Sequence, residues 1–411
     1  MIALLVLLAG TTASAMAAPQ AAPGPPAGAS PRPVNPKKEA RKAPVLAMTP
    51  SWTIDLPAPP AAGAAVDAAN AYVPLRSSEL IALSLQDGKI SWSARIAGVV
   101  TPPATGDGFV FLAHAQQVEA LDAHSGTSRW RVAIDGPISA PLLWMNGWLL
   151  AISEGGEATM LRAATGAVMW KQALGAAASV QPTAADGHVY VALEDGRVVA
   201  LALESGKTAW EAKLPARGTT IHPLDDRIFV GGSDKFFYCL AAESGTTKWR
   251  WRTGGTIIGT VAVDADRVYF VALDNVLRAL DRSNGSQIWK TSLTHRPTGG
   301  PYLTARLLLV PGISAEVPAF QSFDGSAAGT AELAGEPAAP PSLLPAAGDK
   351  LGRLLAISGE GQAQLLVPGL AALPGRAIPG LPMFTLPPEI RQISTGVLWP
   401  ASSSFTTLAN R

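Results

Sequence analysis

The sequence has a single cysteine, Cys239, in 411 residues, so no disulfide can form within the chain. It also has almost no excess charge: 32 Lys and Arg stand against 31 Asp and Glu, a formal net charge of +1. Nucleic-acid binding needs a concentrated cationic surface, and this balance therefore disfavours it. Cys239 lies within an apolar run, where we expect a small buried side chain rather than a reactive one.

Recognisable catalytic motifs are missing as well. The chain has no G-x-S-x-G elbow, no H-E-x-x-H and no Walker phosphate loop. Its five histidines are scattered, with no pair at metal-ligand spacing. We expect His124 and His188 in or beside turns, and His114 and His222 at strand ends. Most carboxylates stand at hairpin positions, where Asp supports the turn. The sequence therefore predicts no catalytic residue, no metal site and no cofactor. His295 is the remaining histidine, and it too is in no pair at metal-ligand spacing.

What the sequence does contain is a repeat. Six tryptophans follow one another at intervals of 38, 40, 40, 39 and 40 residues, and each is preceded by a glycine four positions earlier. A fixed period of about 40 residues marks a chain built from one supersecondary unit. The tryptophans are Trp92, Trp130, Trp170, Trp210, Trp249 and Trp289, and the glycines are Gly88, Gly126, Gly166, Gly206, Gly245 and Gly285.

The content of each unit is β. In residues 182–214, turns at 186–187, 194–196 and 204–206 separate the short apolar runs HVYVAL and RVVALAL from the tryptophan strand. This pattern predicts four antiparallel strands per repeat. The run at 198–203 is apolar on both faces, which suits a sheet covered on both sides by its neighbours. Radially packed blades provide that cover, so we predict an all-β propeller.

The number of blades follows from counting copies. A seventh copy occupies 319–333, with Gly325 in register and Gly329 where tryptophan belongs, and a weaker eighth occupies 343–368. Trp52 lies 40 residues before Trp92 and opens SWTIDL. We therefore predict eight blades, the last completed by residues 51–56, which leaves no open sheet edge. The alternatives are seven blades, and closure by a C-terminal strand around Trp399.

The repeated A-x-D-x-x-T-G-x-x-x-W pattern resembles the tryptophan-docking motif of the PQQ-like, or quinoprotein, β-propeller family. It is best matched by Ala120, Asp122, Gly126 and Trp130, and the resemblance extends over most of residues 51–333. It implies that each tryptophan packs between adjacent blades. The repeated tryptophans and glycines are therefore expected to be structural.

The family includes PQQ-dependent dehydrogenases, which makes an enzyme the competing hypothesis. In the alcohol-oxidising branch a vicinal disulfide and a calcium site help to hold the quinone, and one cysteine cannot form that disulfide. Connections of two to four residues leave little material for a walled cofactor pocket. The chain is closer in character to the non-catalytic branch that serves outer-membrane protein assembly.

Two segments depart from the repeat and are candidate interfaces. Trp144 and Trp148 flank an Asn-Gly turn, and aromatic rings at a hairpin tip are favoured at interfaces. The alternative is a cross-strand pair packed against the adjacent blade. Arg250, Trp251 and Arg252 form the second candidate, because Arg and Trp dominate interface hot spots.

The two ends of the chain differ from the repeats. Residues 1–17 resemble a signal peptide, with an apolar run too short to span a bilayer and a cleavage site at Ala15 to Ala17. No basic residue precedes the run, so the natural start can lie upstream. Residues 18–50 are expected to be a disordered Pro/Ala-rich linker, 51–370 the propeller and 371–411 a Pro-rich tail. No cysteine stands directly after the cleavage site, so we expect no lipid anchor.

These observations predict an exported, periplasmic or envelope-associated scaffold that binds protein partners, with a role in outer-membrane protein assembly implied by the resemblance. The alternatives are a PQQ-dependent oxidoreductase, a polysaccharide-active enzyme and a ligand-binding sensor propeller. Partner, binding face and oligomeric state are left open by the sequence.

Overall fold

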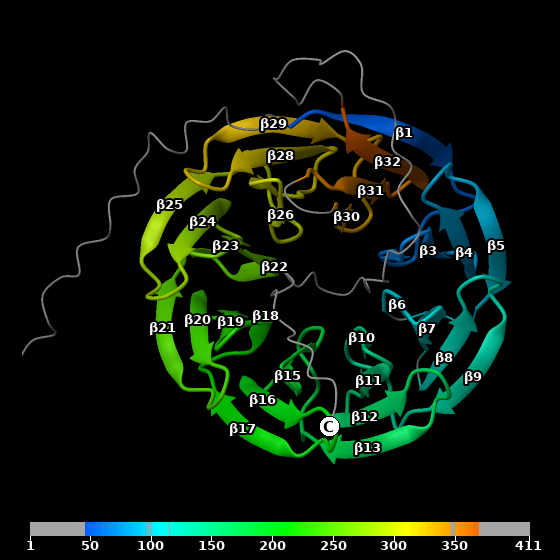
Figure 1. Cartoon of the computed structure of the whole chain (residues 1–411), viewed down its shortest axis with the longest axis horizontal. Helices are drawn as coiled ribbons and strands as arrows, with labels where there is room; N and C mark the ends of the chain where they lie inside the picture. Colours follow the sequence, from blue (N-terminus) through cyan, green and yellow to red (C-terminus); the bar gives the residue numbers. More distant parts are fainter. Residues whose placement is uncertain (1–45, 97, 100, 115, 347–349, 370–411) are drawn as a thin grey trace, which may run out of the picture. The chain divides into compact units, whose positions relative to one another are not determined.

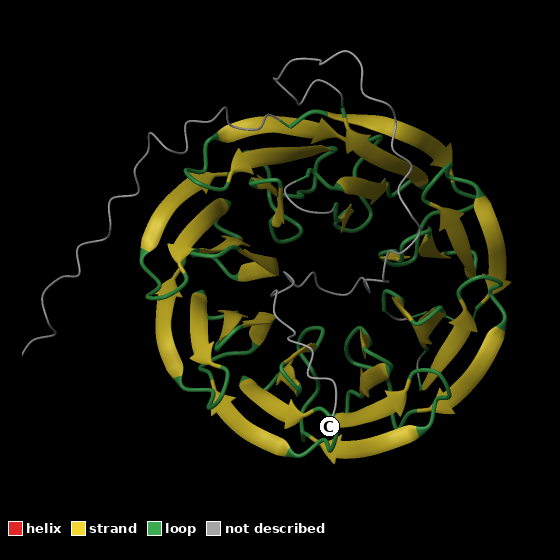
Figure 2. Ribbon diagram, viewed as in Figure 1, coloured by secondary structure: helices red, strands yellow, loops and turns green. Residues whose placement is uncertain are grey.

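Eight four-stranded antiparallel sheets are arranged around a ring in the computed structural model of the protein (Figure 1). The structure describes residues 46–96, 98–99, 101–114, 116–346 and 350–369. These residues form strands and connections only, as Figure 2 shows, and among them there is no helix that could cross a membrane. The prediction of an all-β, eight-bladed propeller is therefore confirmed, and the seven-bladed alternative is wrong. The predicted signal peptide, most of the linker and the C-terminal tail lie outside the described residues.

The first four blades follow the chain in order. Blade 1 contains β2 (Ala65–Val66), β3 (Asn70–Leu75), β4 (Glu79–Ser84) and β5 (Ile90–Arg95). Blade 2 contains β6 (Ala104–Gly106), β7 (Phe109–Ala113), β8 (Gln117–Asp122) and β9 (Ser128–Ala133). Blade 3 contains β10 (Leu143–Met145), β11 (Trp148–Ile152), β12 (Glu157–Arg162) and β13 (Val168–Ala173). Blade 4 contains β14 (Thr183–Ala185), β15 (His188–Ala192), β16 (Arg197–Ala202) and β17 (Thr208–Lys213).

The other four blades complete the ring. Blade 5 contains β18 (Gly218–Leu224), β19 (Arg227–Gly232), β20 (Phe236–Ala241) and β21 (Thr247–Arg252). Blade 6 contains β22 (Ile257–Val263), β23 (Arg267–Ala272), β24 (Val276–Asp281) and β25 (Gln287–Ser292). Blade 7 contains β26 (Tyr302–Thr304), β27 (Leu307–Leu309), β28 (Glu316–Gln321) and β29 (Ala327–Glu332). Blade 8 contains β30 (Ser342–Leu344), β31 (Arg353–Ile357), β32 (Gln362–Pro368) and β1 (Met48–Asp55).

Burial along the strands explains the composition of each blade. The second and third strands, such as β15 and β16, are buried over four consecutive residues because both faces of the sheet are covered by neighbouring blades. The fourth strands form the outer wall and alternate, with exposed residues between partly buried ones, as in β17. Apolar runs on both faces in the middle of a blade and alternation at its rim are therefore consequences of radial packing.

The ring is closed by the N-terminal strand. β1 pairs antiparallel with β32, with Ile54 opposite Ala363 and Met48 opposite Pro368, so the blue β1 lies beside the orange β32 in Figure 1. The closing strand is the one predicted from SWTIDL. The folded region begins earlier than predicted, because β1 starts at Met48 and Leu46 is already buried. The alternative closing strand around Trp399 lies outside the described residues.

Because consecutive strands are antiparallel, the connections alternate between two faces of the ring. One face, here called the paired-turn face, carries the turns between first and second strands and between third and fourth strands. The opposite face carries the turns between second and third strands and the connections between blades. Several of the latter, such as residues 134–142 and 174–182, are longer than the two to four residues expected from the sequence. They are longer because the chain must return from the outer wall to the inner strand of the next blade.

Candidate functional site

Each repeated tryptophan lies on the fourth strand of its blade and reaches into the next blade. The indole Nε1 donates a hydrogen bond to a backbone carbonyl that follows the third strand of that blade. The pairs are Trp92 to Ala123 (3.0 Å), Trp130 to Ala163 (2.9 Å), Trp170 to Leu203 (2.7 Å), Trp210 to Ala242 (2.8 Å), Trp249 to Arg282 (3.2 Å) and Trp289 to Ser322 (3.1 Å). Trp52 of β1 bonds in the same way to Leu85 at 3.3 Å. The bonded carbonyls satisfy indoles that lie in a largely apolar seam.

The glycines lie directly under these rings. Gly206 has a φ of +68°, and a Cβ placed on it would lie 2.5 Å from Cε3 of Trp170. Glycine is required there for two reasons: the backbone is left-handed, and the indole occupies the space that a side chain would need. All six predicted glycines share this arrangement with the indole of the preceding blade. Each glycine therefore contacts the tryptophan of the previous repeat, not the one that follows it in sequence.

One seam has no tryptophan, and a leucine fills it. Gly329 of β29 stands where the indole of blade 7 would be, and a Cβ on it would lie 3.2 Å from Cβ of Leu46. The amide of Leu46 donates to the carbonyl of Ala328 at 2.7 Å, and its side chain is 5% exposed within the core shared by blades 7 and 8. Leu46, two residues before β1, thus seals the seam between blades 7 and 8.

The two extra tryptophans of blade 3 lie on opposite faces of their sheet. Trp144 faces blade 2, where its ring occupies the space above Gly106, and Trp148 packs on the core shared with blade 4. Both are partly buried. In the register of β10 and β11, Trp148 lies opposite Met145 and Trp144 opposite Leu149. They are therefore not a cross-strand pair, and they do not form one continuous aromatic patch; an interface role for their exposed edges stays a prediction.

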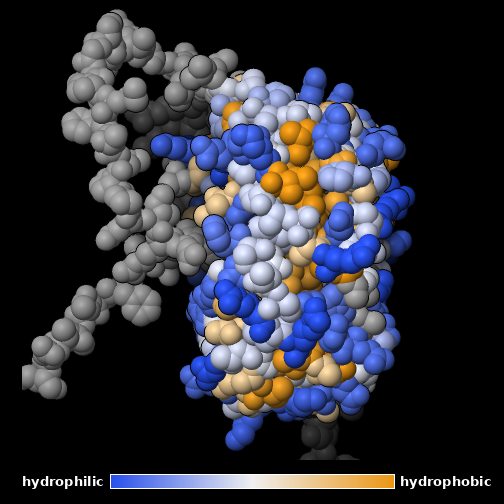
Figure 3. Space-filling model, turned by 90° about the vertical axis from the view of Figure 1, so that its right-hand side faces the viewer, coloured by the Kyte–Doolittle hydropathy of each residue, from blue (hydrophilic) through white to orange (hydrophobic). Residues whose placement is uncertain are grey.

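The second predicted interface lies on the outer wall of blade 5. Arg250 and Arg252 are exposed on β21, and Trp251 between them is partly buried. The guanidinium of Arg250 stands 5.0 Å from the ring centroid of Phe236, within range of a cation–π contact. This outer wall also carries exposed apolar residues on the fourth strands of other blades: Ile90, Val168, Met169 and Ile288. Figure 3 shows the side of the ring on which β5 and β9 lie, where apolar patches are separated by hydrophilic side chains.

The histidines do not converge on a site. His222 lies within β18 rather than at a strand end, and burial lowers its pKa to about 4. His114 follows β7 and is buried, with Nε2 3.1 Å from Oε2 of Glu119. Burial opposes ionisation of Glu119, but Arg131, 2.8 Å away, holds the pKa of the carboxyl below its usual value. No group of three or more potential metal ligands is found within the described part of the chain.

The donor set does not match the quinone site of the alcohol-oxidising branch. Cys239 is buried in β20, and this burial raises the pKa of its thiol. It has no second cysteine with which to form the vicinal disulfide. The residues that the structure describes also offer no cluster of carboxylates for calcium.

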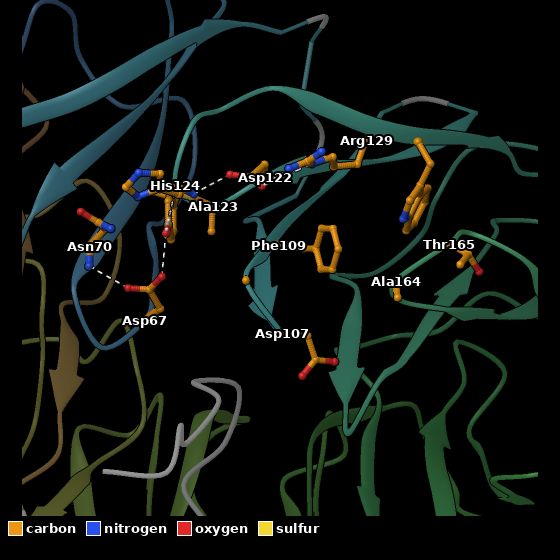
Figure 4. Close-up of a pocket in the computed structure, with 13 residues that line it drawn as sticks. Asp67, Asn70, Asp107, Phe109, Asp122, Ala123, His124, Arg129, Ala164 and Thr165 are labelled. Atoms are coloured by element: carbon orange, nitrogen blue, oxygen red, sulfur yellow. Dashed lines mark hydrogen bonds and ion pairs between the residues drawn. The ribbon is translucent and has the colours of Figure 1, made fainter. Parts of the chain in front are cut away.

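A cavity lies on the paired-turn face, where it extends over blade 2 from blade 1 to blade 3. Its volume is about 840 Å³, and Figure 4 shows the side chains that surround it. The lining residues come from four hairpin turns and the ends of the strands beside them: Asp67, Asn70, Tyr72, Asp107, Gly108, Phe109, Asp122, Ala123, His124, Arg129, Trp130, Ala164 and Thr165.

Two of the three carboxylates in this cavity already have hydrogen-bond or ion-pair partners within the protein. Asp67 accepts hydrogen bonds from the amide of Asn70 at 2.7 Å and from the hydroxyl of Tyr72 at 2.6 Å. Burial and this bond to Asp67 raise the pKa of Tyr72. Asp122 binds Arg129 at 2.6 Å, and this hydrogen bond lowers the pKa of Asp122 to about 2. Asp107 forms no hydrogen bond or ion pair with any residue that the structure describes.

Sequence reasoning missed this cavity. From the sequence, Asp107 is interpreted as a turn residue and Asp122 as part of the tryptophan-docking motif, and the sequence does not show which turns share a rim. A signal was nevertheless present, because Phe109 occupies a repeat position that carries arginine in blades 5 and 6.

Comparisons with known proteins agree with the repeat and the fold. The family model described as outer membrane protein assembly factor BamB matches residues 49–133, 114–223 and 194–362. The outer membrane protein assembly factor BamB of Yersinia pestis is 25% identical over 261 residues, which cover 60% of this chain and 58% of that relative, less than two thirds of its length.

Solved structures show the same architecture. BamB from Moraxella catarrhalis superposes with a TM-score of 0.64 at 18% identity, over 78% of this chain and 99% of that one. The quinohemoprotein alcohol dehydrogenase from Comamonas testosteroni superposes with a TM-score of 0.65 at 13% identity, over 78% of this chain and 76% of that one. At these identities the structural matches show the fold alone. The family model, however, spans all eight blades, and the chain therefore belongs to the family of PQQ-like β-propellers described as outer membrane protein assembly factor BamB.

Proposed function

We propose that the protein is an exported, non-catalytic scaffold that binds protein partners during assembly of outer-membrane proteins. The observation that carries this proposal is the family match, which extends from residue 49 to residue 362 and so includes every blade. Fold alone would be insufficient, because propellers host unrelated functions. The signal-like residues 1–17 support export to the periplasm or envelope.

The surface of the ring suits binding better than chemistry. Within the described residues many ionisable side chains pair with a neighbour, most often in the same blade, as Arg197 does with Asp195 at 2.7 Å. Such pairs leave few groups poised for proton transfer. Two rims of turns and an outer wall instead present large surfaces of mixed polarity, like those of protein–protein interfaces.

Cross-linking in the native envelope tests the proposal. A photoreactive residue is placed at exposed positions on the paired-turn face, on the opposite face and on the outer wall, and the captured proteins are identified. Capture of components of outer-membrane protein assembly from one of these surfaces supports the proposal. Failure to capture any of them from all three surfaces, with the protein correctly exported, contradicts it.

A quinone-dependent oxidoreductase is the second candidate, because a quinohemoprotein alcohol dehydrogenase shares this fold. A specific ligand that binds only the folded protein must raise its stability by mass action. Titration with PQQ and calcium, followed by absorbance and thermal unfolding, therefore separates the two candidates. An unchanged melting temperature removes the oxidoreductase.

A further inference from the structure

At the seam between blades 5 and 6, two arginine side chains fill the space at the rim of the paired-turn face. Arg227, the first residue of β19, crosses to blade 6, where its Nη1 donates to the carbonyls of Arg282 at 3.2 Å and Ser283 at 3.0 Å. Arg282 in turn reaches back, and its Nη2 binds Oδ2 of Asp225 at 2.7 Å. Two guanidinium groups thus satisfy one turn carboxylate and two turn carbonyls. Arg267 of blade 6 repeats the crossing, with Nη1 3.1 Å from the carbonyl of Ser322 in blade 7.

The seam between blades 2 and 3 has the same backbone without the arginines. Three positions can be compared between the two seams. The first is the turn aspartate, which has the same φ of 51° in both blades, and the second is the first residue of the second strand. The third is the residue of the next blade whose carbonyl accepts the indole hydrogen bond. The blade 5 seam has Asp225, Arg227 and Arg282 at these positions. The blade 2 seam has Asp107, Phe109 and Ala163.

The blade 2 seam therefore has no guanidinium group to fill the space at its rim. Phe109 is too short to cross the seam and has no polar group to offer, so its ring forms the middle of the cavity wall, with Asp107 below it and Ala164 and Thr165 opposite (Figure 4). The Asp107 carboxylate is exposed, and its Oδ2 stands 3.7 Å from where a Cβ on Gly147 of blade 3 would lie. The carbonyl of Ala164, equivalent to that of Ser283, accepts no hydrogen bond from the described residues.

We propose that this cavity binds an arginine side chain of a partner protein. The incoming guanidinium takes the place that Arg227 and Arg282 occupy in blade 5, donating to Asp107 and to the carbonyls of the blade 3 turn while its plane lies on the Phe109 ring. A guanidinium matches this set because it presents several donors in one plane and stacks on aromatic faces. An ammonium group presents its donors at a point and does not stack, so lysine fits less well.

The inference rests on the proposed function, because it names the partner chemistry recognised at one place on a protein-binding scaffold. Charge supports it. The carboxylates of Asp67 and Asp122 already have partners, and Arg129 is neutralised by Asp122, so Asp107 is the carboxylate that a cation would meet. A neutral or acidic side chain would leave Asp107 without a counterion.

Binding of short blocked peptides to the purified full-length protein tests the inference. The probes are three peptides, each acetylated and amidated, which differ at one central residue: arginine, lysine or citrulline. Citrulline has nearly the shape of arginine without its charge. Chemical-shift changes of the Trp130 indole N–H, assigned with a Trp130→Phe variant, report occupancy because Trp130 lines the cavity. We expect saturable shifts with the arginine peptide, weaker binding of the lysine peptide and none of the citrulline peptide.

Two variants locate the site. Asp107→Asn removes the charge and should weaken arginine binding about tenfold; asparagine suits the left-handed turn, since Asn146 holds the same position in blade 3 with a φ of 45°. Phe109→Arg should abolish binding, because the new side chain fills the cavity as Arg227 fills its own seam. Asp186→Asn, at the same turn position in blade 4, is the matched control and should leave binding unchanged.

Three results would overturn the inference: no saturable shift with the arginine peptide, equal shifts with citrulline, or equal affinity in Asp107→Asn and the parent protein. The proposed function fails separately, through the envelope cross-linking. If assembly components are captured while the arginine peptide does not bind, the scaffold stands and this site does not. If the peptide binds at Asp107 while no assembly component is captured, the site stands on a scaffold with a different partner.

Discussion

Replacing Trp170 with alanine removes one of the seven indoles that hold adjacent blades together, and the structure gives the expected cost. The side chain is 9% exposed, and its Nε1 lies 2.7 Å from the carbonyl of Leu203. An indole buries up to about 250 Å², which at about 25 cal/mol per Å² sets an upper limit of about 6 kcal/mol. The unfolded chain already buries part of this area, so about 3 to 5 kcal/mol of unfolding free energy should be lost.

Guanidinium unfolding followed by circular dichroism measures this loss, and two variants on the same strand calibrate it. Trp170→Phe keeps most of the ring but leaves the Leu203 carbonyl without its donor, so it should cost about 1 to 3 kcal/mol. Val168→Ala, at a position 49% exposed on β13, should change stability by less than about 0.5 kcal/mol. If Trp170→Ala cost no more than Val168→Ala, the indoles would not be what holds the seams, and the argument would be refuted.

A double-mutant cycle with Gly206 tests the contact itself. In the parent protein Gly206→Ala forces a Cβ to within 2.5 Å of the Trp170 ring and also strains a φ of +68°. In the Trp170→Ala background the collision disappears and only the backbone strain remains, at about 1 kcal/mol. The double variant should therefore be clearly more stable than the sum of the single losses predicts. Strict additivity would show that ring and glycine do not touch.

Three further predictions concern other parts of the ring. Leu46→Ala should cost about 2 to 4 kcal/mol and speed hydrogen exchange in β29 and β32, because Leu46 seals the seam without an indole; Thr49→Ala, exposed on β1, should do neither. Burial holds the pKa of His222 at about 4 against about 6.5 in the unfolded chain. Because the unfolded chain binds the proton between these values, stability should fall by up to about 3 kcal/mol as pH drops from 6.5 to 4, and His222→Gln should flatten this decline in pH-dependent denaturation. Combining Arg227→Phe with Arg282→Ala reproduces the blade 2 seam in blade 5 and should create a second site for the arginine peptide, seen as a doubled stoichiometry in calorimetry.

The fold could be predicted because the same sequence signals recur in many copies of the repeat. A single hairpin signal such as Asp186 and Gly187 is weak, but six aligned copies with tryptophan and glycine at fixed positions leave few architectures. Closure of the ring could also be predicted from the sequence, because Trp52 lies 40 residues before Trp92. The length of the connections between blades could not be read in the same way. Those residues belong to neither strand pattern, and the distance from the outer wall to the next inner strand is a tertiary property.

The side-chain contacts of the seams were only partly predictable. The motif implies that a tryptophan packs between blades, but the sequence places Gly206 beside Trp210, four residues away, whereas the structure places it under Trp170. The closure of the last seam by Leu46 has no sequence signal, because Leu46 precedes the repeat and Gly329 merely lacks a side chain. Packing across the ring brings together residues that the repeat alone does not pair.

The cavity depends on a position of the repeat that carries different side chains in different blades. Blades 2 and 5 have the same backbone at the first turn of the rim, so the difference between the filled seam and the open one depends on a few side chains that fall outside the conspicuous motif. Arg227 in blade 5 and Phe109 in blade 2 occupy one structural position, yet the tryptophan intervals of 38 to 40 residues shift the copies against one another and hide the equivalence. Aligning the copies through the first turn of each blade, where Asp107 and Asp225 have the same φ of 51°, removes that shift. The blades of one propeller can therefore be compared with one another. A side chain that fills a seam in one blade indicates the ligand chemistry that an unfilled seam in another blade can accept.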